Sequence, residues 1–107
     1  ATSEKQDLGW YLDGLVSAVL GTHTHVGTVD ARILPKGTAY VTDVGMTGPV
    51  NSVIGCDTGA VLDRFLTAMP QRLPVADGPV MLNSVLVDIN PETGEALTIQ
   101  RLDKRVG

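Results

Sequence analysis

Apolar residues recur at helical spacing in two stretches of the chain, residues 3–14 and 58–70. Each stretch predicts an amphipathic helix, because positions three and four apart share one helix face. The apolar positions of the first stretch and its edge are Leu8, Tyr11, Leu12 and Leu15. Those of the second stretch are Val61, Leu62, Phe65, Leu66 and Met69.

Capping residues flank both predicted helices. Ser3 and Gln6 have the spacing of a capping box, which satisfies free N–H groups of the first turn. Gly14 suits the left-handed residue that follows a helix. We expect Asp57 to cap the second helix and Pro70 to stop it.

Shorter apolar runs between the helices predict strands. Residues 15–20 are almost wholly apolar, which is typical of a strand buried on both faces. Residues 31–34 and 38–44 are separated by Pro-Lys-Gly and predict a hairpin or two neighbouring strands. Residues 45–55 contain several glycines and a proline and predict a loop.

The clearest hairpin lies near the end of the chain. Residues 79–89 and 95–102 flank the turn sequence Asn-Pro-Glu-Thr-Gly at 90–94. Alternation places one set of side chains on one face of the first strand, namely Val85, Val87 and Ile89. The order of helix, strand, loop, strands, helix and strands predicts an α/β fold.

Composition narrows the class of protein. At 107 residues and 43% hydrophobic, the chain has the size of one globular domain or part of a larger one. Its net charge of −4 disfavours non-specific nucleic-acid binding, which needs clustered Lys and Arg. Cys56 is the single cysteine and cannot form an internal disulfide. Because no membrane span or signal peptide is evident either, we expect a cytoplasmic protein.

Both histidines lie within residues 20–27, Leu-Gly-Thr-His-Thr-His-Val-Gly, two positions apart. In an extended segment, His23 and His25 would point to the same side, about 6.6 Å apart at ~3.3 Å per residue. Two imidazoles at that spacing bind one cation, or one ion each of a metal pair. The motif is equally compatible with structural histidines at the surface.

Two imidazoles form an incomplete metal site, because a divalent ion needs about four or more ligands. We expect Thr22 and Thr24 to form hydrogen bonds that fix the loop. Asp43 is expected to act as a hydrogen-bond partner behind the ligands, or equally as a turn cap. Gly45 begins the segment Gly-Met-Thr-Gly-Pro, which either lines a phosphate pocket or forms an ordinary tight turn.

Residues 21–26, 31–49 and 52–55 closely resemble the YmdB-like branch of the calcineurin-like metallophosphoesterases, and the resemblance extends over nearly the whole chain. It implies a four-layer α/β/β/α sandwich, of which residues 1–107 form the C-terminal portion of a single domain whose N-terminal portion is absent. It also implies a phosphodiesterase that acts on cyclic nucleotides, notably 2′,3′-cyclic ones, with two divalent metal ions (Fe, Mn or Mg).

The resemblance assigns His23 and His25 as metal ligands, one imidazole for each ion. It implies that the remaining ligands and the catalytic residues lie upstream, so this chain alone is expected to be inactive. We expect a small-molecule substrate, no membrane contact, and a homo-oligomer, because incomplete sheets expose apolar edges. The alternative hypothesis is a non-catalytic fragment or assembly module with structural histidines.

Overall fold

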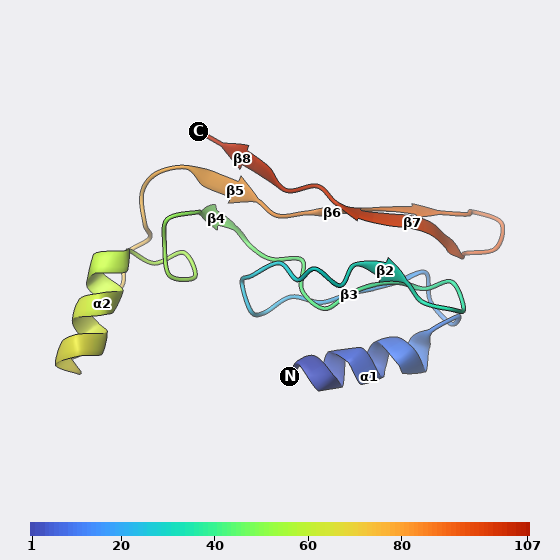
Figure 1. The fold of residues 1–107 in the computed structure, drawn as a ribbon, viewed down its shortest axis with the longest axis horizontal. Coiled ribbons are helices and arrows are strands. Elements are labelled where there is room, and N and C mark those ends of the chain that lie inside the picture. Colours follow the sequence, from blue (N-terminus) through green and yellow to red (C-terminus); the bar gives the residue numbers. More distant parts are fainter. The chain divides into compact units, whose positions relative to one another are not determined.

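The computed structural model describes all residues from 1 to 107, and its contacts divide the chain into two compact units (Figure 1). The first unit contains Ala1–Met46 and Asn83–Asp103. The second unit contains Thr47–Leu82 and Lys104–Gly107. Two helices are each followed by four strands along the chain, and this mixture of helices and strands confirms the predicted α/β class. That the chain is part of a single domain stays a prediction.

The first unit is built on a three-stranded sheet in the order β1-β3-β2. Its strands are β1 (Ala18–Leu20), β2 (Arg32–Ile33) and β3 (Ala39–Val41). The central strand β3 pairs parallel with β1 and antiparallel with β2, which confirms the predicted hairpin. All of β3 is buried, whereas Leu20 of β1 is 45% exposed. The expectation of a strand buried on both faces at 15–20 is therefore wrong.

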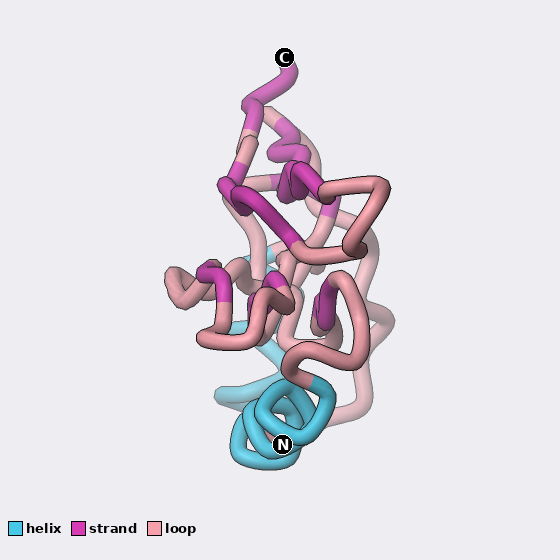
Figure 2. Tube along the Cα trace, turned by 90° about the vertical axis from the view of Figure 1, so that its right-hand side faces the viewer, coloured by secondary structure: helices cyan, strands magenta, loops and turns pink.

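A helix and a hairpin lie on opposite sides of this sheet (Figures 1 and 2). Helix α1 (Thr2–Leu12) packs closely at Gly9, where a Cβ atom would come within 2.7 Å of the Tyr40 ring. Strands β6 (Val85–Ile89) and β7 (Ala96–Arg101) form the predicted hairpin, and β7 contacts β2 and β3. The unit thus stacks helix, sheet and hairpin in three layers. The full four-layer sandwich stays a prediction.

The buried interior of the first unit is small and partly polar. Its buried apolar residues are Leu34, Ala39, Tyr40, Val41 and Ala96. Its buried polar residues are Asp13, Thr38, Thr42 and Asp43. Every buried side-chain nitrogen and oxygen has a hydrogen-bond partner. Breaking one of these hydrogen bonds would leave a buried polar group unpaired, at a cost of about 1–3 kcal/mol. The bonds therefore hold the surrounding loops to β3.

Helix α1 begins one residue earlier than expected. Its first bond runs from the N–H of Lys5 to the carbonyl of Ala1, so the predicted capping box of Ser3 and Gln6 is wrong. Gly14 follows the helix with φ of +85°, as predicted. Two apolar positions of the helix stay largely exposed, Leu8 at 51% and Tyr11 at 77%, and Leu15, beyond the end of the helix, is 72% exposed.

The second unit contains an antiparallel sheet in the order β4-β5-β8. Its strands are β4 (Thr47–Pro49), β5 (Val80–Leu82) and β8 (Lys104–Val106). β4 corrects the prediction of a loop throughout 45–55, because Pro49 is tolerated at the end of an edge strand. The run 79–89, expected to be one strand, is divided into β5 and β6.

Helix α2 (Thr58–Thr67) carries the predicted N-cap, since Asp57 Oδ2 accepts a hydrogen bond from the N–H of Ala60 at 2.9 Å. The helix ends before Pro70, at a left-handed Ala68 with φ of +55°. Its apolar side is exposed, with Phe65 at 80%. At 11 and 10 residues, α1 and α2 are each too short to cross a bilayer.

Candidate metal centre

Both histidines lie on the segment that joins β1 to β2, and we call residues 21–28 the histidine loop. The loop leaves β1 alongside β3, because the N–H of Gly21 donates to Val41 O at 3.0 Å. The carbonyl oxygen of Gly21 accepts a hydrogen bond from the N–H of Val44 at 2.8 Å. A Cβ atom at Gly21 would overlap the carbonyl oxygen of Thr42, so only glycine fits this exit.

The histidine loop is not extended, so the predicted extended conformation of residues 21–26 is wrong. His23 has φ of +120° and His25 has φ of +70°, values that residues with a side chain rarely adopt. Each strained residue costs about 1–3 kcal/mol and persists only where its surroundings hold it. Both histidines are exposed to solvent. Their ring nitrogens are therefore available to a ligand.

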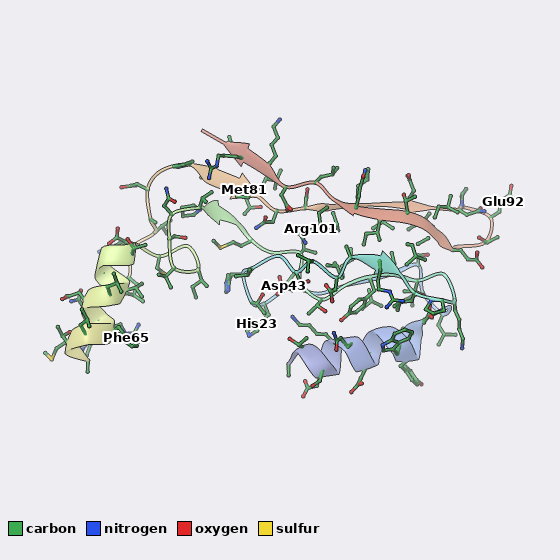
Figure 3. The ribbon with its side chains drawn as sticks, viewed as in Figure 1. His23, Asp43, Phe65, Met81, Glu92 and Arg101 are labelled. Carbon is green, nitrogen blue, oxygen red and sulfur yellow. The ribbon has the colours of Figure 1, made fainter.

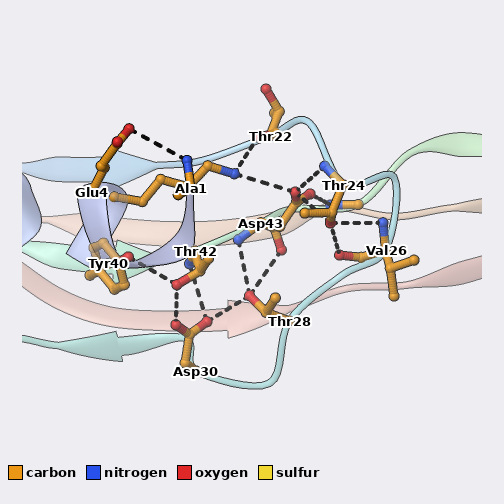
Figure 4. A network of polar contacts seen from close by, with 12 residues as sticks. Ala1, Glu4, Thr22, Thr24, Val26, Thr28, Asp30, Tyr40, Thr42 and Asp43 are labelled. Carbon is orange, nitrogen blue, oxygen red and sulfur yellow. Dashed lines mark hydrogen bonds and ion pairs between the residues drawn. The ribbon is translucent and has the colours of Figure 1, made fainter.

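Asp43 anchors the histidine loop (Figure 4). Its Oδ2 accepts hydrogen bonds from the N–H and the Oγ1 hydroxyl of Thr24, both at 2.7 Å. Its Oδ1 accepts from the N–H of Gly45 at 2.8 Å. Since Thr24 lies between the two histidines, Asp43 fixes the loop through the residue that joins them. This geometry fits both roles expected for Asp43, support behind the ligands and capping of a turn.

The pKa of Asp43 reflects opposing effects. Burial raises the pKa, because its fully buried carboxylate loses solvation when charged. Hydrogen bonds from Thr24 and Gly45, together with the positive charge of Lys5, lower the pKa by more. The pKa of Asp43 is therefore lowered overall, and the carboxylate remains an acceptor at neutral pH.

A second carboxylate, Asp30, supports the far end of the loop and was missed in the sequence. It accepts hydrogen bonds from Thr28 Oγ1 at 2.6 Å, from Thr42 N at 3.1 Å and from the Thr42 hydroxyl. Burial opposes its ionisation, but these bonds outweigh that effect and lower the pKa of Asp30. The sequence signal that could have identified Asp30 is its spacing from Thr28, because polar side chains two positions apart commonly form hydrogen bonds within turns.

The loop threonines differ in how they support the site. The Oγ1 hydroxyl of Thr24 donates to Asp43 Oδ2 and accepts the N–H of Val26 at 3.2 Å, so this side chain fixes the loop through two hydrogen bonds. Thr22 is exposed and takes part through its backbone carbonyl, which accepts from Lys5 Nζ at 2.5 Å.

Gly45 is explained by local packing. It has φ of +95°, and a Cβ atom would come within 2.7 Å of Asn83 Nδ2. The Asn83 amide in turn donates to the carbonyl of Met46 at 2.7 Å. A phosphate-binding role for Gly45 stays a prediction.

A hollow of about 170 Å³ in the first unit lies between α1 and the β2–β3 hairpin. It is lined by Gln6, Trp10, Asp30, Arg32, Leu34 and Tyr40. Ligand pockets usually enclose about 300–1,000 Å³, so this hollow is small for a nucleotide. The histidines do not line it, and it is not the candidate site.

The two imidazoles fit a metal ion as a partial set of ligands. No group of three or more His, Cys, Asp or Glu side chains is placed to hold a metal. The carboxylates that bond to the histidine loop, those of Asp43 and Asp30, are occupied by donors of the loop and sheet. A complete coordination sphere would need donors beyond those gathered here.

Comparison with known proteins shows which family and which relatives the chain is similar to. Residues 1–102 match a family model described as YmdB-like protein. Over 102 residues the chain is 56% identical to a protein of Bacillus subtilis (strain 168) named 2',3'-cyclic-nucleotide 2'-phosphodiesterase. The match covers 95% of this chain and 39% of that protein.

Two solved structures share its backbone. A hypothetical protein from Thermus thermophilus is 48% identical with a TM-score of 0.90, over 98% of this chain and 41% of that chain. A novel phosphatase from Mycoplasma pneumoniae is 36% identical with a TM-score of 0.92, over 98% of this chain and 38% of that chain. The chain thus spans less than half the length of each of these relatives.

Proposed function

The chain belongs to the YmdB-like protein family, and from this premise we propose that it is part of a metal-dependent phosphodiesterase. We propose 2′,3′-cyclic nucleotides as the substrates, on the strength of the name of the Bacillus subtilis relative. Because the chain spans 39% of that relative, the activity is proposed for the complete protein. The observation that carries the proposal is the exposure of both histidines at strained backbone positions on an anchored loop.

In this proposal, His23 and His25 hold two divalent ions, Fe, Mn or Mg, one imidazole each, in a four-layer sandwich that the rest of the protein completes. When bound, such ions lower the pKa of a bound water and neutralise charge on phosphoryl oxygens. Each imidazole must be neutral to donate its lone pair, so acid weakens binding. Asp43 serves neither as acid nor as base, because its oxygens hold Thr24 and Gly45.

Hydrolysis of 2′,3′-cyclic AMP by the full-length protein tests the proposal. A chelator should abolish the activity, and Mn²⁺ should restore it. His23→Ala and His25→Ala should each lower kcat/KM by at least about 100-fold while the circular dichroism spectrum is unchanged. Gln100→Ala, an exposed polar position on β7, is the control and should retain full activity. Metal-loaded enzyme that leaves 2′,3′-cyclic nucleotides intact would show that the substrate is wrong.

The non-catalytic alternative makes the opposite prediction for the same variants. An assembly module with structural histidines is favoured by the exposed apolar side of α2, where Phe65 is 80% and Leu66 is 79% exposed. Under it, His23→Ala lowers stability or self-association while any hydrolytic activity survives. Loss of activity in a folded His23→Ala protein would dismiss this alternative.

A further inference from the structure

Two basic side chains hold the histidine loop at its opposite ends, and neither is marked by a motif. We infer that Lys5 and Arg101 are positioning residues that keep His23 and His25 in the strained conformation from which they bind metal. The metal-binding part of this inference rests on the proposed function. The bracing of the loop rests on hydrogen bonds within the first unit alone.

Lys5, on α1, holds the start of the loop. Its Nζ donates to the carbonyl of Thr22 at 2.5 Å and lies 3.6 Å from Asp43 Oδ2. One ammonium group thus links the carbonyl directly before His23 to the carboxylate that anchors Thr24. The Lys5 side chain is only 24% exposed and that of Asp43 is 0% exposed, so water screens this pair less than a surface pair.

Arg101, on β7, holds the other end. Its Nη1 donates to the carbonyls of Thr28 and Asp43, each at 3.3 Å, and its Nη2 donates to the carbonyl of Val44 at 2.5 Å. A Cβ atom at Gly27 would overlap the guanidinium, so the loop passes directly against it. In Figure 3, Asp43 lies between the labelled His23 and Arg101.

The guanidinium is itself fixed in place. Asp103 accepts from Arg101 Nε and Nη2, both at 2.9 Å, which raises the pKa of Arg101 and keeps it charged. A planar fork can bond to a carboxylate and several carbonyls at once, whereas an ammonium group cannot hold this geometry. Arginine is therefore needed at this position, and a lysine there would release the loop.

Strain makes this bracing necessary. The left-handed backbone of His23 and His25 costs about 1–3 kcal/mol at each residue, so an unbraced loop would relax. Relaxation would change the positions of the imidazoles and add an ordering cost to metal binding. Removing hydrogen-bond partners that orient metal ligands typically weakens metal affinity by about 10–100-fold.

The test measures Mn²⁺ affinity of the full-length protein by titration calorimetry. Lys5→Met, which keeps the aliphatic stem, should weaken binding by about 10–100-fold, and Lys5→Arg should restore most of the affinity. Arg101→Lys should also weaken binding, since the fork is lost. Lys104→Met, at an exposed lysine of β8, is the matched control and should bind as the wild type does.

Amide hydrogen exchange of the metal-free protein supplies an independent readout. The N–H groups of Thr24 and Val26 bond to Asp43 and to Thr24 Oγ1, and should exchange about 10-fold faster in Lys5→Met at an unchanged global unfolding midpoint. Unchanged exchange in Lys5→Met would overturn the inference, whether or not the affinity falls. Faster exchange in a protein that binds no Mn²⁺ even as wild type would support the bracing and reject the proposed function.

Discussion

Replacing Asp43 with asparagine removes one negative charge from the anchor of the histidine loop at almost constant volume. In the wild type, Oδ2 accepts both bonds from Thr24, and Oδ1 accepts the N–H of Gly45. An asparagine keeps only one of these oxygens. Its NH₂ group must therefore face a donor in either orientation, and one bond is lost.

The size of the loss follows from these contacts. Bonds to a charged group contribute about 1.5–3 kcal/mol and neutral bonds about 0.5–1.5 kcal/mol, so the two Thr24 bonds lose about 1 kcal/mol each. The N–H of Gly45 loses its acceptor at a partly buried site, which costs about 1–3 kcal/mol. We therefore expect Asp43→Asn to lower the free energy of unfolding by about 4 kcal/mol. Total stabilities are about 5–15 kcal/mol, so this is a large effect.

Urea unfolding of the full-length protein, followed by circular dichroism at pH 7, measures the difference. Asp7→Asn is the matched control, because Asp7 is exposed on α1 and should change the free energy of unfolding by no more than about 0.5 kcal/mol. A change of less than about 1 kcal/mol in Asp43→Asn would refute the role of Asp43 as anchor.

The difference in the free energy of unfolding between the wild type and Asp43→Asn should depend on pH. A carboxylate whose pKa is lowered on folding stabilises the protein above its unfolded pKa of about 3.9. That contribution is lost as the pH falls through the folded pKa, because the folded state must then take up a proton. Wild type and Asp43→Asn should therefore differ fully at pH 7 and converge progressively below about pH 4. A difference that stays constant below pH 4 would contradict the lowered pKa.

Three further predictions concern packing, capping and association. Gly21→Ala should lower the free energy of unfolding by about 3 kcal/mol, because its Cβ overlaps the Thr42 carbonyl, whereas Gly59→Ala in α2 should not destabilise the protein. Asp57→Ala should cost about 1 kcal/mol, since Ala60 N–H loses its acceptor; an unchanged urea midpoint would contradict the cap. Residues 1–107 expressed alone should self-associate through their exposed apolar side chains, and light scattering from a stable dilute monomer would disprove this.

Features encoded by neighbouring residues were predictable from the sequence. The turn at 90–94 joins β6 to β7 as expected, since its bonds, such as Gly94 N to Asn90 O at 2.8 Å, lie within the turn itself. The cap at Asp57 and the left-handed Gly14 are also local. Each follows from a side chain or a backbone preference acting within four residues.

Features set by distant partners were not predictable in this way. Periodicity identified the apolar side of α2, but it could not show whether another part of the chain packs against that side. In the structure, Phe65 on this side is 80% exposed. The backbone of the histidine loop depends on Asp43, 19 residues from Thr24, and on Arg101, 73 residues from Thr28. His-x-His spacing holds no information about those contacts, so the extended conformation was the natural expectation and was wrong.

The charges behind the loop bear on the proposed chemistry. The negative charge of Asp43 is matched locally by Lys5, and the charge of Arg101 by Asp103. Imidazole ligands add no negative charge of their own, so ions held by His23 and His25 would keep their positive charge for a phosphoryl group. The charged residues that support the loop are paired with each other, and the proposed ligands are uncharged imidazoles. Such a site is therefore suited to an anionic substrate. A carboxylate in place of either histidine would bind an ion, but its negative charge would weaken the attraction between that ion and the anionic substrate.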